Sequence, residues 1–266
     1  MRLATIRTAV GTRAVRVDAD TAVETGEADL RALLSREDWA AHAAAAAGPT
    51  HPVEGLDYAP LVPSPEKIIC VGLNYRDHVL EMGNQLPEYP TVFAKFAPAL
   101  VGAYDDIELP TISEKVDYEA ELTLVIGRPV RDADDAAAAA AIAGYTILND
   151  VSMRDFQNRT KQFLQGKTFE HSTPLGPVLV TPDELPAGGW AISSSLDGEV
   201  MQDSSTDQLV FGAVELVKYL SAILTLNPGD VIATGTPEGV GPIVDGESVS
   251  ITIEGIGTLT NPVQDI

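Results

Sequence analysis

The pattern of apolar and polar positions divides the chain into a mixed first quarter and a longer part dominated by strands. Residues 1–20 alternate like a β-hairpin with its turn at Gly11–Thr12, and residues 27–46 carry leucines at helical spacing. Four prolines follow between residues 52 and 65, which indicates an extended arm. We therefore expect a small N-terminal α/β domain with its linker over residues 1–65.

From residue 66 to residue 266, short apolar or alternating runs bounded by glycine, proline and acidic residues predict a second, larger domain built mainly of strands. Two helices are expected within it. One covers residues 152–164, where Ser152 and Asp155 resemble a capping box, and the other covers residues 210–224. The chain as a whole is therefore expected to be α+β. The expected strands cover residues 67–73, 91–96, 118–127, 143–150, 176–185, 191–200, 229–235 and 247–263.

Composition argues against several classes of partner. The 266 residues include 17 basic and 39 acidic ones, a net charge of −22. Nucleic-acid binding needs a basic face, so we expect no nucleic-acid partner. No apolar run approaches the roughly 20 residues of a membrane-spanning helix, so we expect no membrane partner. The single cysteine, Cys70, lies in an apolar strand and has no partner for an internal disulfide, which indicates a structural residue and a cytoplasmic protein.

The stretch KVDYEAELTLVIG, residues 115–127, places two like charges on one face of a predicted strand. Side chains alternate along a strand, so Glu119 and Glu121 point to the same side. Two carboxylates about 5 Å apart repel by about 3 kcal/mol at an effective dielectric constant of about 20. The pair is compatible with a solvated edge, an acid/base pair or a site for a hard divalent cation. Asp150, which ends another apolar strand, adds a third carboxylate and favours the cation.

Seven motifs occur in order along residues 67–266 and together carry a resemblance that none of them carries alone. They closely resemble the fumarylacetoacetate hydrolase family. The resemblance implies an α+β fold of layered, rolled mixed β-sheets, assembled as a homodimer. The motifs are VGLNYRDHVLEMG, FAKFAPALVG, VDYEAEL, LNDVSMRDFQ, GKTFEHSTPLGP, GDVIATGTPEGVG and VSITIEGIGTLTNPV.

The resemblance also implies a metal site and a class of substrate. It identifies Glu119, Glu121 and Asp150 as ligands of Mg²⁺, with Mn²⁺ or Ca²⁺ as alternatives. Such a cation would chelate the carboxylate and keto oxygens of a small-molecule 2-oxo acid and make the pyruvate enolate a good leaving group. Three carboxylates, one divalent cation and a nearby lysine, Lys167, sum to about zero charge, so an anionic substrate is compatible with the acidic chain.

Five further positions are assigned to the site by resemblance. Lys167 in QGKTF would be a catalytic residue that stabilises substrate oxyanions, and would otherwise be a surface lysine. Arg154 and Gln157 would contact the substrate, and without the resemblance they would be an ordinary polar helix face. Tyr75 in NYRDH and Thr236 on the glycine-rich turn ATGTPEGVG are the other expected substrate-binding residues.

His78 and Glu81 are the remaining catalytic candidates. They lie three residues apart on a predicted helical turn, so Glu81 can orient the imidazole. By resemblance His78 would take a proton from the attacking water, whereas the alternative is a surface histidine beside a glutamate. Residues 83–90 are expected to form the flexible part of a lid over the site.

These residues favour a Mg²⁺-dependent hydrolase that cleaves a C–C bond in acylpyruvate-type 2,4-dioxo acids. The same metal site would serve oxaloacetate decarboxylation or hydroxymuconate-type isomerisation, and the sequence does not rank these reactions. A non-catalytic ligand-binding relative is a third alternative, against which the match at each catalytic position argues. Glu238 and His171 depart from the family pattern. Glu238 would either restrict which substrates fit or face solvent, and His171 would either contact the substrate or have a structural role.

Overall fold

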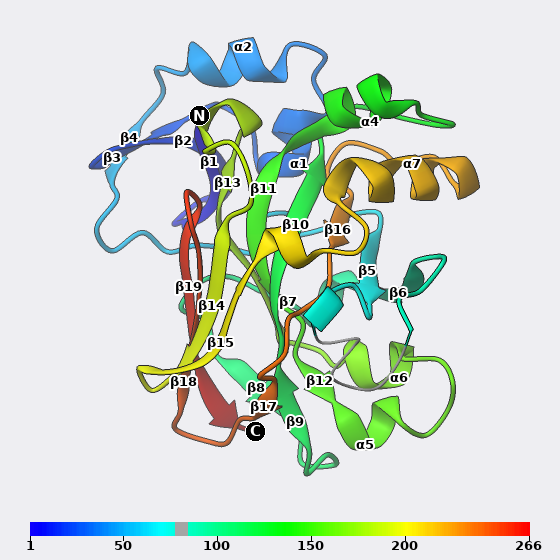
Figure 1. Cartoon of the computed structure of the whole chain (residues 1–266). Coiled ribbons are helices and arrows are strands. Elements are labelled where there is room, and N and C mark those ends of the chain that lie inside the picture. The colour runs from blue at the N-terminus through cyan, green and yellow to red at the C-terminus, as the bar shows by residue number, and fades with distance from the viewer. Residues whose placement is uncertain (78–84) are drawn as a thin grey trace.

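The computed structural model describes residues 1–77 and 85–266, and within them β-sheets dominate over a few short helices (Figure 1). The large sheet has 11 strands in the order β4-β3-β2-β1-β13-β11-β10-β16-β5-β6, with β7 beside β13. This layered, mixed architecture confirms the expected α+β class. The strands of the large sheet are β1 (Arg2–Thr8), β2 (Gly11–Asp18), β3 (Thr21–Glu24), β4 (Thr50–Pro52), β5 (Ile68–Gly72), β6 (Thr91–Lys95), β7 (Leu100–Val101), β10 (Ala120–Ile126), β11 (Ile142–Asn149), β13 (Thr173–Val180) and β16 (Val231–Ala233).

Two smaller sheets accompany the large one. Five strands pair in the order β15-β14-β18-β19-β8, and three pair in the order β12-β9-β17. An apolar core joins the five-stranded sheet to the large sheet, with Leu122 and Ile147 in the same cluster as Ile251 and Leu259. The strands of these sheets are β8 (Ile107–Leu109), β9 (Val116–Tyr118), β12 (Ser152–Met153), β14 (Ala191–Leu196), β15 (Glu199–Ser205), β17 (Gly241–Pro242), β18 (Ser248–Ile253) and β19 (Gly257–Asp265).

The helices are short and lie around the sheets. In Figure 1, α4 and α7 run side by side at one end of the large sheet, and they share a core cluster with β10 and β16. The expected helix over residues 210–224 is confirmed as α7. In the described part of the chain no helix has the length and apolar character needed to cross a bilayer. The α-helices that lie wholly within the described residues are α1 (Leu30–Leu34), α2 (Trp39–Ala44), α4 (Asp135–Ala141), α5 (Arg154–Gln157), α6 (Leu164–Lys167) and α7 (Ala213–Ile223).

Strand β10 is the rigid element on which the site is built. All seven of its residues are buried, because it lies between β11 and β16 and both of its faces are covered. Consecutive side chains alternate between core clusters: Leu124 packs towards α4 and α7, and Val125 packs in the cluster that contains Leu3 and Leu179. A strand buried on both faces reads as nearly continuous apolar sequence, so a charged residue within it needs a specific partner.

The N-terminal strands continue the large sheet. Strand β1 pairs with β13, with Leu3 opposite Leu179, so the first strands extend the sheet that also contains β10 and β11. The predicted boundary near residue 65 lies between β4 and β5. The helical spacing over residues 27–46 corresponds to two short helices, α1 and α2. The predicted turn at Gly11–Thr12 is wrong, because the hairpin turns at residues 9–10 and Gly11 begins β2.

The single helix predicted over residues 152–164 is also wrong. The stretch forms β12, the four residues of α5, and then α6 after a break. Ser152 does not cap a helix, because its hydroxyl donates to the backbone oxygen of Asp150. Asp155 accepts a hydrogen bond from Ser113 Oγ, and the backbone N–H of Arg154 donates to Lys115 O. These contacts with a distant segment replace the predicted capping box.

Candidate active site

Three buried carboxylates converge at the ends of two neighbouring strands. Glu121 lies on β10, Glu119 is the residue immediately before that strand, and Asp150 is the residue immediately after β11. The antiparallel register sets Ala120 opposite Asn149, and the backbone N–H of Asp150 donates to Glu119 O at 2.9 Å. One oxygen from each carboxylate lies within 4.8 Å of the others. The solvated-edge interpretation of Glu119 and Glu121 is therefore wrong, since both side chains are buried.

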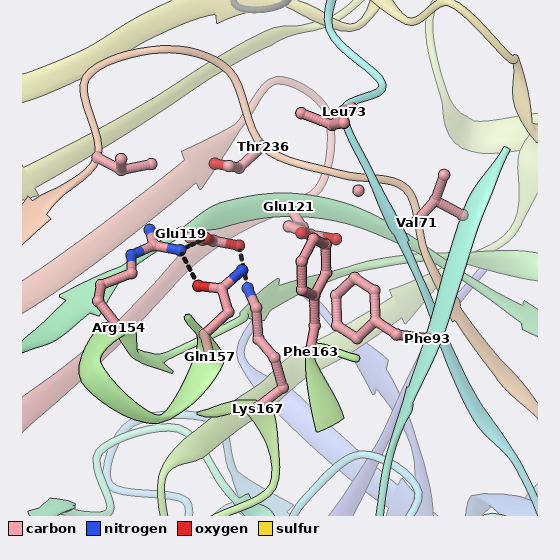
Figure 2. A pocket seen from close by; sticks show the side chains of 12 residues that line it. Val71, Leu73, Phe93, Glu119, Glu121, Arg154, Gln157, Phe163, Lys167 and Thr236 are labelled. Atoms are coloured by element: carbon pink, nitrogen blue, oxygen red, sulfur yellow. Dashed lines mark hydrogen bonds and ion pairs between the residues drawn. The ribbon is translucent and has the colours of Figure 1, made fainter. Parts of the chain in front are cut away.

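Two buried lysines hold this acidic cluster. Lys167 Nζ lies 2.7 Å from Glu119 Oε2 and 2.9 Å from Asp150 Oδ2, and Figure 2 shows its side chain pointing at Glu119. Lys95 Nζ lies 2.6 Å from Asp150 Oδ1 on the other side. Both lysines are only 2% exposed, so Lys167 is not a surface lysine. Lys95 was missed by the sequence analysis, although a lysine at the end of the apolar run TVFA is the signal that would have found it.

Arg154 and Gln157 lie beside the carboxylates. Arg154 Nε donates to Asp117 Oδ2 at 2.7 Å, and its Nη1 lies 2.6 Å from Glu119 Oε1 and 2.9 Å from Gln157 Oε1. Since Gln157 Oε1 accepts from Arg154, the amide NH₂ of Gln157 remains a donor for another group. Both side chains face the cavity and not the solvent-exposed side of α5 (Figure 2).

The cavity beside these residues has a volume of about 270 Å³ and two unlike walls. The charged and polar wall is formed by Glu119, Glu121, Arg154, Gln157 and Lys167, and Thr236 faces Lys167 from the opposite side of the cavity. The other wall is apolar, with Val71, Leu73, Val240 and an edge-to-face pair, Phe93 and Phe163, whose ring centroids are 5.7 Å apart. Such a site suits a small ligand with a strongly anionic part and a less polar part.

The charged groups perturb one another. Burial, together with Asp150 and Glu119, raises the pKa of Glu121 well above its usual range. Burial alone would raise the pKa of Asp150, but Lys167 and Lys95 hold it below its usual range. Burial would lower the pKa of Lys167, yet Asp150 and Glu119 raise it, so this ammonium stays protonated at neutral pH. Lys167 is consequently a donor and a positive charge, and not a general base.

The three carboxylates fit a divalent cation. Their donor set is all oxygen, which suits Mg²⁺, Mn²⁺ or Ca²⁺. Glu119 and Asp150 are paired with lysine, whereas Glu121 accepts its hydrogen bond within the described residues from a backbone group, Gly235 N–H, at 2.8 Å. The raised pKa of Glu121 reflects negative charge that its neighbours do not balance. A cation between the three carboxylates would balance it.

Counting charges gives a different total from the one expected. Three carboxylates and two lysines sum to −1, and Arg154 offsets Asp117. A divalent cation brings the site to +1, whereas the expected total, which includes only one lysine, is about zero. The second lysine, Lys95, therefore makes the site attractive to an anion despite the acidic chain.

The loop after β16 forms the wall opposite Lys167. Thr236 lines the cavity, and in Figure 2 it stands on the loop that passes above Glu119. Gly235 has a φ of +97°, and a Cβ there would lie 2.9 Å from Val71 O, so this tight approach requires glycine. The loop is held at its far end by the Tyr118 hydroxyl, which donates to Gly239 O at 2.7 Å. The expected glycine-rich turn is thus fixed on both sides.

Tyr75 does not line the cavity. It is 1% exposed and packs in the core cluster that contains Tyr118, and its hydroxyl has no hydrogen-bond partner within the described residues. Burial and the charge of Glu121 raise its pKa. The other two candidates, His78 and Glu81, lie outside the described residues.

The two departures from the family pattern lie away from the cavity wall. Glu238 lines a separate pocket with Met201, Asp203 and Gly239. His171 is exposed, and its Nδ1 lies 3.0 Å from Glu108 Oε1. Cys70 is buried in β5, and burial raises the pKa of its thiol, which agrees with a structural role.

Comparison with known proteins identifies relatives along most of the chain. A family model described as fumarylacetoacetate (FAA) hydrolase, C-terminal, matches residues 67–264. The mitochondrial oxaloacetate tautomerase FAHD2A of Bos taurus is 43% identical over 225 residues, which are 81% of this chain and 72% of that protein.

Solved structures agree over the whole chain. The 5-carboxymethyl-2-hydroxymuconate delta-isomerase from Mycobacterium smegmatis is 39% identical, with a TM-score of 0.87 and full coverage of both chains. The fumarylacetoacetate hydrolase from the psychrophilic Exiguobacterium antarcticum is 30% identical, with a TM-score of 0.87 and full coverage of both chains. The fold expected from the motifs is therefore confirmed, and these relatives include a tautomerase, an isomerase and a hydrolase.

Proposed function

This chain belongs to the fumarylacetoacetate hydrolase family, and we propose that it interconverts the keto and enol forms of a short 2-oxo diacid of the oxaloacetate type. The observation that carries the proposal is the pair of buried lysines beside the carboxylate triad. They give the site a net positive charge once a divalent cation is bound, which suits a substrate with two carboxylates. The 43% identity to an oxaloacetate tautomerase supports the same choice.

The proposed chemistry is the movement of one proton between the C2 oxygen and C3. A divalent cation held by Glu119, Glu121 and Asp150 supplies Lewis-acid polarisation of the substrate oxygens when bound. Lys167 places a fixed ammonium where negative charge grows on the C2 oxygen as C3 loses its proton. Because Lys167 stays protonated, the group that removes the C3 proton is another one, and we assign it to His78, oriented by Glu81.

The rest of the cavity binds and orients the substrate. Arg154 and the free NH₂ of Gln157 contact one carboxylate, and the Thr236 loop contacts the other from the opposite wall. Phe93 and Phe163 exclude water from the side of the reacting carbon, which strengthens the electrostatic contacts of Lys167. Homodimerisation and a cytoplasmic location, both expected from the sequence, remain predictions.

Hydrolysis of an acylpyruvate is the second candidate. It uses the same site and adds a water that His78 would activate, and the apolar wall of Phe93 and Phe163 would accept the acyl group. The full-length similarity to a fumarylacetoacetate hydrolase supports it, at 30% identity. Decarboxylation of oxaloacetate and isomerisation of a hydroxymuconate-type diacid also pass through an enolate of a 2-oxo acid, which forms by loss of CO₂ in the first reaction and by loss of a proton in the second.

A product assay on one preparation separates these reactions. The protein with Mg²⁺ or Mn²⁺ is given oxaloacetate, acetylpyruvate and fumarylpyruvate, while enol absorbance, pyruvate, CO₂ and released acid are followed together. We expect keto–enol exchange of oxaloacetate to be accelerated on the order of 10²–10⁴-fold, without pyruvate, and to be lost with EDTA. Pyruvate and acid in equal amounts from an acylpyruvate, with no exchange of oxaloacetate, would replace the tautomerase by the hydrolase.

A further inference from the structure

Gln202 connects the five-stranded sheet to both walls of the site through one side chain. It lies on β15 and is 1% exposed. Its Oε1 accepts from the backbone N–H of Ala120 at 3.1 Å, and its Nε2 donates to Thr236 Oγ1 and to Pro237 O, both at 2.9 Å. Every donor and acceptor site used by this amide therefore belongs either to the strand of the carboxylate triad or to the Thr236 loop.

The orientation of this amide is determined by its two backbone partners. The Ala120 N–H is only a donor, so it must face the amide oxygen, and the Pro237 carbonyl is only an acceptor, so it must face the NH₂ group. The other hydrogen of the NH₂ group then points at Thr236 Oγ1, which acts as the acceptor of this bond. A hydroxyl has a single hydrogen, and the hydrogen of Thr236 is thereby directed away from Gln202.

The consequence is a hydroxyl with a defined polarity at the cavity. Thr236 lines the cavity on the wall opposite Lys167, and the bond from Gln202 uses its oxygen as the acceptor. We propose that Gln202 is a positioning residue that fixes Thr236 as a hydrogen-bond donor towards the cavity, so that the loop prefers an acceptor-only group such as a substrate carboxylate. This inference rests on the proposed function in one respect, namely that Thr236 contacts a substrate carboxylate.

The same side chain sets the distance between the two walls. Ala120 stands between Glu119 and Glu121, so its N–H bond ties Gln202 to the backbone that carries two of the three carboxylates. A ligand that contacts both the triad and Thr236 spans the two groups that this one amide holds in place. The amide thus links the orientation of the Thr236 donor to the position of the triad.

A double-substitution cycle tests the polarity directly. Thr236→Val and Gln202→Met are made alone and together, and oxalate, an acceptor-only dianion, is titrated by calorimetry into the Mg²⁺-loaded proteins. We expect each single substitution to raise the dissociation constant of oxalate about 10-fold or more, as for loss of one hydrogen bond to a charged group. The double variant should be no weaker than Thr236→Val, because Gln202 acts through the hydroxyl.

Further variants separate orientation from general structure. Gln202→Glu keeps an acceptor for Ala120 but turns the Thr236 hydrogen towards residue 202, so it should weaken oxalate more than Gln202→Met does, and only while the hydroxyl is present. Mg²⁺ affinity, measured without oxalate, should stay within a few-fold of the parent in each variant, and Thr236→Ser should keep the parental oxalate affinity. If the Gln202→Met protein does not fold, Gln202→Glu replaces it in the double-substitution cycle. The melting temperature of each variant checks that it is folded.

The outcomes for the two proposals differ. If Thr236→Val leaves oxalate affinity unchanged, Thr236 does not contact a carboxylate, and that part of the proposed function fails with the inference. Suppose instead that Thr236→Val weakens oxalate binding while Gln202→Met lowers oxalate affinity by the same factor whether residue 236 is Thr or Val. In that case Gln202 only supports the loop. The inference is then overturned, and the proposed function stands.

Discussion

Replacing Glu121 by glutamine should abolish turnover and divalent-cation binding while making the metal-free protein more stable. Glutamine has the same shape and keeps an oxygen for the N–H of Gly235, so the strand should be undisturbed. It removes one of three buried carboxylates, whose pKa is raised by burial and by the charges of Asp150 and Glu119. We expect cation affinity to fall by more than the roughly 10–100-fold that is typical when a residue hydrogen-bonded to a metal ligand is lost. The free energy of unfolding of the metal-free protein should rise by about 1–3 kcal/mol.

The measurements are Mg²⁺ or Mn²⁺ titration by calorimetry and thermal unfolding with EDTA and with excess cation. The parent should gain stability from the cation and Glu121→Gln should not. Because the pKa of Glu121 is raised, the folded parent takes up a proton at this residue more readily than the unfolded chain does. Stability from that proton is present at low pH and is lost as the pH rises, so the advantage of the variant should shrink on acidification.

Glu199→Gln is the matched control, since Glu199 is an exposed glutamate on β15 and lies outside the triad. It should change neither cation affinity nor the response of melting temperature to the cation. If Glu121→Gln binds the cation as tightly as the parent does, the three carboxylates are not the metal site. A metal-free Glu121→Gln protein less stable than the parent would mean that the buried charges are already balanced within the protein.

The clustering of the three carboxylates was predictable because its signal is local. Glu119 and Glu121 share a face through strand alternation, and Asp150 ends a strand of recognisable apolar character. Asp150 lies beside Glu119 because β10 and β11 pair with each other. These two strands are neighbours in the large sheet and are joined by one short helix. To bring the three carboxylates together, sequence reasoning needed only the assumption that these two strands pair, and such neighbours commonly do. Their assignment as metal ligands rested on the resemblance to the family.

Lys95 and Gln202 were not predictable in the same way, because their roles depend on non-local contacts. Lys95 lies on β6, the edge strand of the large sheet, and reaches Asp150, which lies 55 residues later in the chain. Gln202 comes from another sheet and contacts Ala120, 82 residues earlier. In sequence Lys95 ends an apolar run, which marks it as unusual without naming its partner, and Gln202 is one of several polar residues in its strand. The partners of both depend on burial, and burial is set by packing between sheets.

The broken helix after Asp150 has the same origin. The spacing of apolar residues over 152–164 is helical, but Arg154 and Asp155 are held by the segment at 113–115, and the chain turns there. The result brings Arg154 and Gln157 to the cavity, with Lys167 following on α6. Local propensity is thus overridden where three side chains of the site must converge.

Replacing Lys167 by methionine should have the opposite effect on stability to Glu121→Gln. Methionine keeps most of the side-chain volume but removes the ammonium that pairs with Glu119 and Asp150. Two buried carboxylates then lose a partner, so the metal-free protein should lose about 3–5 kcal/mol of unfolding free energy. Turnover should fall about 1,000-fold, because the positive charge beside the developing oxyanion is gone.

Cation binding should survive this substitution. Lys167 Nζ contacts oxygens of Glu119 and Asp150, two of the three ligands, so its removal leaves the triad more negative and Mg²⁺ affinity equal to or above that of the parent. Calorimetric titration, kcat with saturating cation, and melting temperature with EDTA and with Mg²⁺ measure the three effects. Added Mg²⁺ should recover much of the lost stability and none of the lost kcat.

Lys161→Met is the matched control, because Lys161 lies six residues earlier and is exposed. It should match the parent in all three measurements. A Lys167→Met protein with parental kcat would restrict Lys167 to a structural role, and one that no longer binds the cation would mean that the lysine shapes the triad and does not balance it. Glu121→Gln is expected to lose the cation and gain metal-free stability, whereas Lys167→Met is expected to keep the cation and lose stability. Only a triad that carries excess negative charge, and a lysine that acts on substrate, predict both results together.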